Sequence, residues 1–304
     1  MSTYRFDGRV AVVTGAGRGI GRAYAHLLAA RGARVVVNDL GGTKEGDGHD
    51  PEPSQRVVEE IVGAGGSAIP QTSDVSTVAG GQALIDAAVG EFGRIDIVVN
   101  NAGIIRWGGL PDADAGNLKS HLAVHVGGSF NTTRAAWPHM VEQGYGRVVM
   151  TTSTGMFGLV DNLGYATAKA AVVGMTRSLT VAGRPHGIKI NLIAPNAWTR
   201  MAGQVETPAQ STPKQMEPEL VAPMVAYLAH EACEVSGEIY LAGGGRFARI
   251  FIAATQGFLP AQPAQTTMED VAENWAAIND ETGYYVPADL MDWSAHYMSH
   301  WSPD

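Results

Sequence analysis

The sequence predicts an α/β fold, a single doubly wound parallel sheet that carries a C-terminal extension. Over about the first 250 residues, short runs rich in valine and isoleucine alternate with longer segments of helical periodicity, the pattern of repeated βα units. A glycine-rich turn joins the first run to the first helical segment, and no long linker or internal repeat interrupts the series. We therefore expect one domain over residues 1–250 and an extension over residues 251–304.

Composition narrows the class of protein. Hydrophobic residues make up 45% of the 304 residues, enough for a sizeable core, and the net charge of −9 is opposite to the basic stripe that nucleic-acid binding requires. The only cysteine, Cys233, excludes an intrachain disulfide and favours a reducing compartment. The N-terminus lacks the apolar run of a signal peptide, and no stretch approaches the ~20 apolar residues of a membrane span. We expect a cytoplasmic protein without membrane or nucleic-acid partners.

The first expected strand, residues 9–14, runs into the glycine-rich turn, and a helical segment follows as far as Arg31. Such a turn brings backbone N–H groups and a helix N-terminus against a pyrophosphate. An ordinary tight turn is the alternative, but a second strand over residues 34–39 begins directly after the helix, as in a Rossmann dinucleotide-binding unit. The cofactor-binding candidates in the turn are Gly15, Arg18, Gly19, Ile20 and Gly21.

Asp39 ends the second strand about 20 residues after the glycines, where an acidic residue hydrogen-bonds the adenosine ribose of NAD. A carboxylate there would repel the 2′-phosphate of NADP, whereas Arg18 could attract it, and capping of the strand end is a third interpretation. The position favours the ribose contact, and hence NAD. Residues 41–54, polar and rich in glycine and proline, form an unusually long connection, which indicates a functional or mobile loop.

The next two units add residues at the carboxyl ends of strands, where ligands bind in open α/β sheets. A helix over 55–64 and a strand over 68–71 come first, then a helix over 78–91 and a strand over 95–99. Asp74, after the earlier strand, could cap the following helix, contact adenine, or do both. The cofactor-crevice candidates at these strand ends are Asp74, Val75, Asn101, Ala102 and Gly103.

A long helix is expected over residues 114–136, and His121 and His125 lie on it four residues apart. This spacing would suit two metal ligands, but no third ligand is apparent, so we predict no metal site. The strand that follows, over 147–152, carries Ser153 at its end.

The helix after Ser153 carries Tyr165 and Lys169, which share one face because they are four residues apart. Tyrosine titrates near 10, and a lysine cation one turn away should favour the phenolate, which makes the pair a plausible general acid/base. A chance YxxxK on an ordinary helix is the alternative. Strands over 188–193 and 235–241 complete the series.

Beyond residue 250 the βα pattern stops. The extension holds eight acidic residues and no lysine or arginine. Its three tryptophans and three tyrosines are unlike a disordered tail, so we expect it to pack on the body or on a partner subunit. Thr266 or Thr267 ahead of Asp270 resembles a capping box at the start of a helix. The apolar face of that helix would consist of Val271, Trp275 and Ile278.

Together these residues resemble a known family, the short-chain dehydrogenases/reductases, over about residues 7–245. The motifs that carry the resemblance are TGAGRGIG at residues 14–21, NNAG at residues 100–103, Ser153, Tyr165 with Lys169, and Pro195. A narrower similarity is to the (3R)-hydroxyacyl-CoA dehydrogenase part of the peroxisomal multifunctional β-oxidation enzyme and its bacterial stand-alone relatives. The segments that carry it are residues 38–42, 124–130, 133–140 and 194–197.

The resemblance implies interconversion of a secondary alcohol and a ketone with NAD as cofactor. Tyr165 would take the hydroxyl proton, and Lys169 would lower the pKa of Tyr165 and bind the nicotinamide ribose. Ser153 would position the alcohol; family spacing by count points instead to Thr152, and we favour Ser153. His125 stands where most members have an asparagine that holds a relay water, and the narrower subfamily also uses histidine there. The remaining cofactor contacts implied are Pro195 and, at the carboxamide, Thr199.

Three functions stay open: a 3-hydroxyacyl-CoA dehydrogenase, a dehydrogenase of a free alcohol such as a 17-hydroxysteroid, and a catalytically silent NAD-binding protein. The complete set of catalytic residues speaks against the last. A CoA ester brings phosphates, for which Arg106, Arg246 and Arg249 are candidate partners. The aromatic extension would cover the apolar part of the substrate or join subunits of a homodimer or homotetramer. Its tryptophans are Trp275, Trp293 and Trp301.

Overall fold

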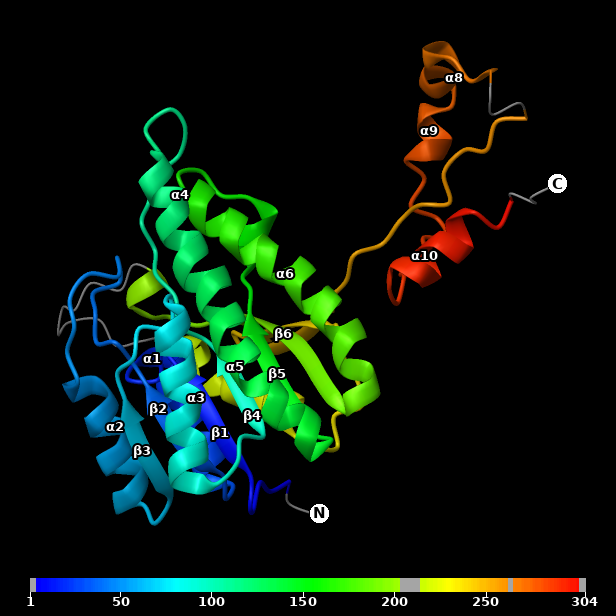
Figure 1. The fold of residues 1–304 in the computed structure, drawn as a ribbon. Helices are drawn as coiled ribbons and strands as arrows, with labels where there is room; N and C mark the ends of the chain where they lie inside the picture. The colour runs from blue at the N-terminus through cyan, green and yellow to red at the C-terminus, as the bar shows by residue number, and fades with distance from the viewer. Residues whose placement is uncertain (1–3, 203–213, 262–264, 301–304) are drawn as a thin grey trace. The chain divides into compact units, whose positions relative to one another are not determined.

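The computed structural model describes residues 4–202, 214–261 and 265–300. An eight-stranded sheet runs through the first part of the chain in the order β3-β2-β1-β4-β5-β6-β7-β8 (Figure 1). Neighbouring strands from β3 to β7 are parallel. The strands are β1 Val10–Thr14, β2 Arg34–Asn38, β3 Ser67–Gln71, β4 Ile97–Asn100, β5 Gly146–Thr151, β6 Ile188–Asn196, β7 Ile239–Gly243 and β8 Arg246–Ile250.

Helices cover both faces of this sheet, which confirms the doubly wound fold. On one face α3, α5 and α6 lie over the strands (Figure 1). On the other, α1, α2 and α7 share one buried apolar cluster with β1 and β2. Every residue of β1, β4 and β5 is buried, as expected for parallel strands packed on two sides. The helices are α1 Gly19–Ala30, α2 Glu52–Gly63, α3 Val78–Phe92, α4 Ala115–His121, α5 Gly128–Gln143, α6 Leu163–Gly183 and α7 Ala222–Ala229.

The strand order reverses between β1 and β4, because the chain leaves β1 on one side for β2 and β3 and returns on the other for β4. In open α/β sheets the carboxyl ends of strands at such a reversal border the crevice in which ligands bind. The glycine-rich turn follows β1 and the NNAG segment follows β4, so both open onto this crevice.

Three expectations about secondary structure were wrong in detail. The helix expected over 114–136 is instead α4, a π-helical stretch over Leu122–Gly127, and α5, which continues to Gln143. The helix after the long loop begins at Glu52 because Pro53 is tolerated in a first turn. An eighth strand, β8, was missed; it is a short edge strand directly after two turn glycines.

The chain divides into two compact units, Met1–Arg249 and Ile250–Asp304. The second unit contains helices α8 Met268–Glu273, α9 Trp275–Ile278 and α10 Leu290–Tyr297. The capping box is present, formed by Thr267 and Asp270. The single helical face expected across Val271 and Trp275 was wrong, because the helix is interrupted at Asn274. Trp301 lies outside the described residues.

The extension has local structure, and none of its described residues is buried. Tyr285 pairs with Ala254 in an antiparallel bridge, and Phe251 stacks on Tyr284. No residue of α8, α9 or α10 is buried. Across the described part of the chain, no helix has the length and apolar character that crossing a bilayer demands.

Candidate active site

The glycine-rich turn has the geometry of an anion cradle. Gly15 and Gly19 have φ values of +63° and +55°, which disfavour other residues. A Cβ on Gly21 would collide with the carbonyl oxygen of Gly15, so the third glycine lets α1 pack closely against the turn. No side chain caps the start of α1, which leaves its first N–H groups available to a phosphate. The Nη1 atom of Arg18 is buried here and has no hydrogen-bond partner among the described residues.

Asp39 is held at the carboxyl end of β2 by two backbone donors. Its Oδ2 accepts from the Gly17 N–H at 2.8 Å and its Oδ1 from the Gly41 N–H at 2.7 Å. The carboxylate therefore lies directly beside the glycine turn, with both oxygens oriented by the backbone. A carboxylate oxygen has a second lone-pair site, so these bonds leave capacity for a ribose hydroxyl.

The residues after β4 support the turn from the other side of the crevice. The Asn101 side chain donates to the carbonyl oxygens of Thr14 and Gly15, at 2.9 and 3.0 Å. Ala102 approaches Gly15 so closely that a Cβ on the glycine would lie 2.9 Å from the Ala102 Cα. Asn101 thus fastens the two strand ends to each other, a supporting role that its sequence position did not reveal.

The other cofactor candidates occupy different parts of this rim. Thr199 lies beside the turn, because a Cβ on Gly19 would be 3.5 Å from its Cγ2. Val75 is buried and its carbonyl accepts from the Asn131 side chain. The interpretation that Asp74 caps α3 was wrong, because Thr77 is the N-cap residue. The Asp74 carboxylate accepts instead from the Ser76 N–H. Pro195 lies near the end of β6 and Ile20 in the first turn of α1.

Ser153 and Tyr165 meet at the carboxyl end of β5. A hydrogen bond with Ser153 lowers the pKa of the Tyr165 phenol, but burial, the larger effect, raises it above its usual value. Ser153 also caps the short 3-10 helix Thr154–Phe157 by accepting from the Gly155 N–H. Thr152 is fully buried and donates to the Lys169 carbonyl oxygen at 2.7 Å. The structure thus brings Ser153, and not Thr152, to the tyrosine.

Lys169 is buried beneath the tyrosine. Its Nζ donates to the Thr151 carbonyl oxygen at 2.9 Å and lies 5.5 Å from the centre of the Tyr165 ring. Burial lowers the pKa of the Lys169 ammonium to about 7. Desolvation is the largest effect on both groups and disfavours the charged form of each. That Lys169 favours the Tyr165 phenolate stays a prediction.

His125 borders the same tyrosine from the π-helical stretch. Its ring meets the Tyr165 ring edge-on, with centroids 5.4 Å apart. Its Nε2 lies 2.8 Å from the Ile104 carbonyl oxygen, while its buried Nδ1 has no hydrogen-bond partner among the described residues. Burial and the nearby Lys169 hold the pKa of His125 well below its usual value, so it is neutral. Gly103 makes room for the ring, since a Cβ there would lie 2.5 Å from the His125 Cε1.

His121 is a second histidine at the site that the sequence did not single out for this role. It stacks on His125 at 5.9 Å and meets Tyr165 edge-on at 6.2 Å. Its Nδ1 contacts the Asn117 carbonyl oxygen and its Nε2 accepts from the Arg106 N–H. Both nitrogens are thus engaged by the backbone. No cluster of three metal-ligating side chains occurs in the residues that the structure describes.

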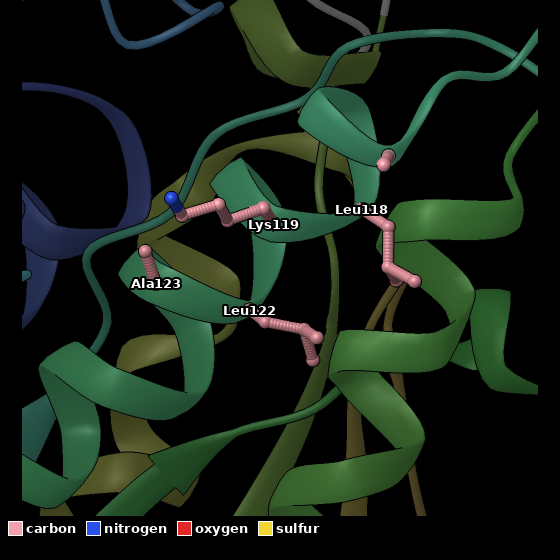
Figure 2. Close-up of a pocket in the computed structure, with 5 residues that line it drawn as sticks. Leu118, Lys119, Leu122 and Ala123 are labelled. Atoms are coloured by element: carbon pink, nitrogen blue, oxygen red, sulfur yellow. The ribbon is translucent and has the colours of Figure 1, made fainter.

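The opposite face of this helical stretch borders a separate open surface pocket of about 450 Å³ (Figure 2). It has an apolar lining apart from one lysine and contains none of the candidate catalytic groups. The lining residues are Ala115, Leu118, Lys119, Leu122 and Ala123.

The three candidate phosphate-binding arginines differ in their surroundings. Arg249 forms an ion pair with Glu238 at 2.7 Å. Arg106 forms one with Asp47 at 3.0 Å and also donates to the Glu45 carbonyl oxygen. Arg246 is exposed at the start of β8.

Comparison with known proteins agrees with this geometry. The family model described as "short chain dehydrogenase" matches residues 9–210. The chain is 42% identical over 276 residues to a putative short-chain type dehydrogenase/reductase of Mycobacterium tuberculosis, covering 90% of this chain and 95% of the relative. It is 40% identical over 296 residues to the mouse peroxisomal multifunctional enzyme type 2, covering 96% of this chain and 39% of that protein. It therefore spans less than half the length of the multifunctional relative.

Among solved structures, a 7α-hydroxysteroid dehydrogenase complexed with NADH and 7-oxo glycochenodeoxycholic acid superposes with a TM-score of 0.70 at 30% identity. The match covers 79% of this chain and 95% of that one. The chain belongs to the short-chain dehydrogenase family and is an oxidoreductase. The resemblance expected from the sequence, to the multifunctional enzyme and to bacterial stand-alone members, is confirmed.

Proposed function

We propose that this oxidoreductase uses NAD to interconvert a secondary alcohol and a ketone, and that its substrate is a 3-hydroxyacyl-CoA. The observation that carries the proposal is the meeting of Ser153, Tyr165 and Lys169 at the carboxyl end of β5, on the same edge of the sheet as the glycine turn and Asp39. A nicotinamide cofactor, when bound, supplies hydride acceptance and donation. The protein supplies a proton carrier and the orientation of the reacting oxygen.

The residues divide this work by position. Ser153 and the neutral Tyr165 phenol can both donate to a substrate carbonyl oxygen, and in the oxidation direction Tyr165 accepts the hydroxyl proton. Lys169 uses one of its three donors on the Thr151 carbonyl, which leaves two for a ribose hydroxyl. His125, with a buried unpaired Nδ1, can accept a hydrogen bond from a relay water.

The cofactor would be held mainly by the β1–α1 turn. Its free N–H groups and the unpaired Arg18 Nη1 suit the pyrophosphate, and Gly103 would line the nicotinamide side of the crevice. Asp39 would bind the adenosine ribose and exclude NADP, because like charges in contact across an interface cost several kcal/mol. Asp39→Ser should therefore raise kcat/KM with NADP and lower it with NAD. Asp86→Ser, which changes an exposed aspartate on α3, should leave the cofactor ratio unchanged.

The CoA ester is supported by the narrower sequence similarity and by Arg246. This arginine is exposed and, unlike Arg106 and Arg249, has no ion-pair partner among the described residues, so it is available to a phosphate. A free steroid alcohol is the second candidate, because a hydroxysteroid dehydrogenase shares the fold over most of both chains. A non-catalytic NAD-binding protein would not need Ser153, Tyr165 and Lys169 together.

The deciding experiment is a substrate panel: 3-hydroxyacyl-CoA esters, hydroxysteroids and simple secondary alcohols, each with NAD and with NADP. The proposal expects the highest kcat/KM for a CoA ester with NAD, and an increase in KM for that ester in Arg246→Ala. A hydroxysteroid oxidised faster than every CoA ester, together with unchanged kinetics in Arg246→Ala, would replace the leading substrate by the second.

We further propose a homo-oligomer, dimer or tetramer, in the cytoplasm, where the buried free thiol of Cys233 would stay reduced. The extension supports the oligomer, because large apolar side chains such as Trp275, Leu290 and Met291 are 60–75% exposed in the single chain. Deleting residues 251–304 should then reduce the number of chains in the oligomer or raise the KM for the substrate. A truncated protein with the same assembly and the same KM would show that the extension only stabilises the fold.

A further inference from the structure

Arg106 is the residue at which three parts of the site meet. It lies just after the NNAG segment, and its main chain and its side chain bind different elements. On the main-chain side, its N–H donates to the His121 Nε2 at 3.2 Å, and its carbonyl oxygen accepts from the Asn117 side chain at 3.0 Å. Both partners belong to α4. The backbone of Arg106 thus fixes the orientation of a histidine that contacts Tyr165.

The side chain of Arg106 reaches the long loop that follows Asp39. Its Nε donates to the Glu45 carbonyl oxygen at 2.6 Å, and its Nη2 pairs with Asp47 at 3.0 Å. The Ile105 N–H donates to the Lys44 carbonyl oxygen at 2.8 Å, which adds a third bond between the same two segments. The ion pair alone would contribute little, since its aspartate is 73% exposed. However, two donors of one planar guanidinium bind two separate loop groups, a carbonyl and a carboxylate, and so fix the position of the loop relative to Arg106.

The loop is itself tied to the adenosine side of the crevice. The Gly41 N–H donates to Asp39, and the Asp50 N–H closes the loop on the Leu40 carbonyl. At the other end, Ile104, two residues before Arg106, contacts the His125 Nε2 through its carbonyl oxygen. Hydrogen bonds, joined by short stretches of backbone, therefore connect the Asp39 carboxylate through the loop to the segment 104–106 and from there to the two histidines beside Tyr165.

We propose that Arg106 is a positioning residue, which fastens the 41–50 loop to the backbone that orients His121 and His125 and so couples the adenosine end of the site to the acid/base end. This inference rests on the proposed function for the identity of the two ends. It also differs from the expectation that Arg106 binds a phosphate of the substrate, because its guanidinium is already engaged within the chain.

The test compares Arg106→Met and Arg106→Lys with Arg56→Met, a matched control that removes an exposed arginine paired with Glu52 on α2. Methionine keeps the main-chain bonds and an unbranched apolar stem in place of the arginine methylenes, but it has no donor to hold the loop. For Arg106→Met we expect the NADH dissociation constant to rise about tenfold and kcat to fall about tenfold or more. The KM for the alcohol should change less than threefold. Lysine, which can hold one of the two loop partners, should restore part of both losses.

Two readouts do not depend on turnover. NADH binding is measured by fluorescence titration, and the ring nitrogens of His121 and His125 are observed by NMR in the protein without cofactor. Arg106→Met should shift the signals of both rings, and Arg56→Met should shift neither. If no alcohol in the panel is oxidised, the proposed function fails while these two readouts still decide the coupling.

Two results would overturn the inference. A rise in KM for the CoA ester with unchanged kcat, NADH affinity and histidine signals would make Arg106 a substrate ligand. Full wild-type values for every quantity in Arg106→Met would show that the loop needs no such fastening.

Discussion

Burial of Lys169 in the active site should lower the stability of the fold by an amount that depends on pH. Its ammonium is fully buried, and burial lowers its pKa from 10.5 to about 7. A group whose pKa is depressed on folding binds fewer protons in the native state, so stability is greatest above the unfolded pKa and falls as the pH drops toward the folded pKa. The window for Lys169 is therefore pH 10.5 down to about pH 7.

The magnitude follows from the slope of about 1.4 kcal/mol per pH unit for one proton. Between pH 9 and pH 6 the titration of Lys169 should lower the free energy of unfolding by about 2–3 kcal/mol. Lys169→Met removes this term while keeping the length of the side chain. The variant should gain about 2–3 kcal/mol more stability, relative to wild type, at pH 6 than at pH 9. It should also lose dehydrogenase activity.

Urea unfolding at the two pH values, without cofactor, measures this difference. Lys119→Met on α4 is the control, because that lysine is exposed and its replacement should have the same small effect at both pH values. Burial also lowers the pKa values of His121 and His125, so both destabilise the folded protein as the pH falls to 6, but this effect is present in wild type and variant alike and cancels in their difference. Equal changes in stability at pH 6 and pH 9 for Lys169→Met would refute the assignment of a buried, weakly basic lysine.

Two further predictions concern the neighbours of Tyr165. Ser153→Ala should lower kcat, and loss of the cap on the 3-10 helix should cost about 1 kcal/mol of stability. Thr152→Ala should largely spare kcat but cost about 1–3 kcal/mol by removing a buried hydrogen bond to a helix carbonyl. Stopped-flow kinetics and urea unfolding of both variants measure the two effects, and a larger loss of kcat in Thr152→Ala would assign catalysis to the threonine. Gly103→Ala should displace the His125 ring and lower kcat, whereas Gly90→Ala, with open space around its Cβ, should not; equal activity of the two variants would mean that the position of the ring does not matter.

The fold, and the meeting of the main candidate residues at one edge of the sheet, could be predicted because they depend on local patterns. Alternating apolar runs, the glycine turn and Asp39 each have a physical requirement that is visible over a few residues. Counting residues left open whether Ser153 or Thr152 supplies the hydroxyl beside Tyr165. In the structure the Thr152 hydroxyl donates to the Lys169 carbonyl, which leaves the Ser153 hydroxyl for Tyr165.

What could not be predicted depends on contacts between distant segments. The roles of His121 and Arg106 come from the docking of the 41–50 loop and α4 onto one backbone segment, which no periodicity reveals. The π-helical stretch had no signal in the helical pattern. The pKa shifts of Lys169 and Tyr165 both have burial as their largest cause, and burial depends on the packing of the whole domain, which the spacing along one helix does not reveal.

The central claim is that Tyr165 carries the proton in a nicotinamide-dependent alcohol oxidation, and Tyr165→Phe tests it most directly. The phenylalanine ring can keep the edge-on contacts with the two histidines, so NADH affinity should change less than about twofold. The single-turnover rate with the best alcohol of the panel should fall by at least about 100-fold, because general acid/base groups contribute ~10²–10⁴-fold. A variant that binds NADH normally and keeps more than about a hundredth of the wild-type rate would contradict the account.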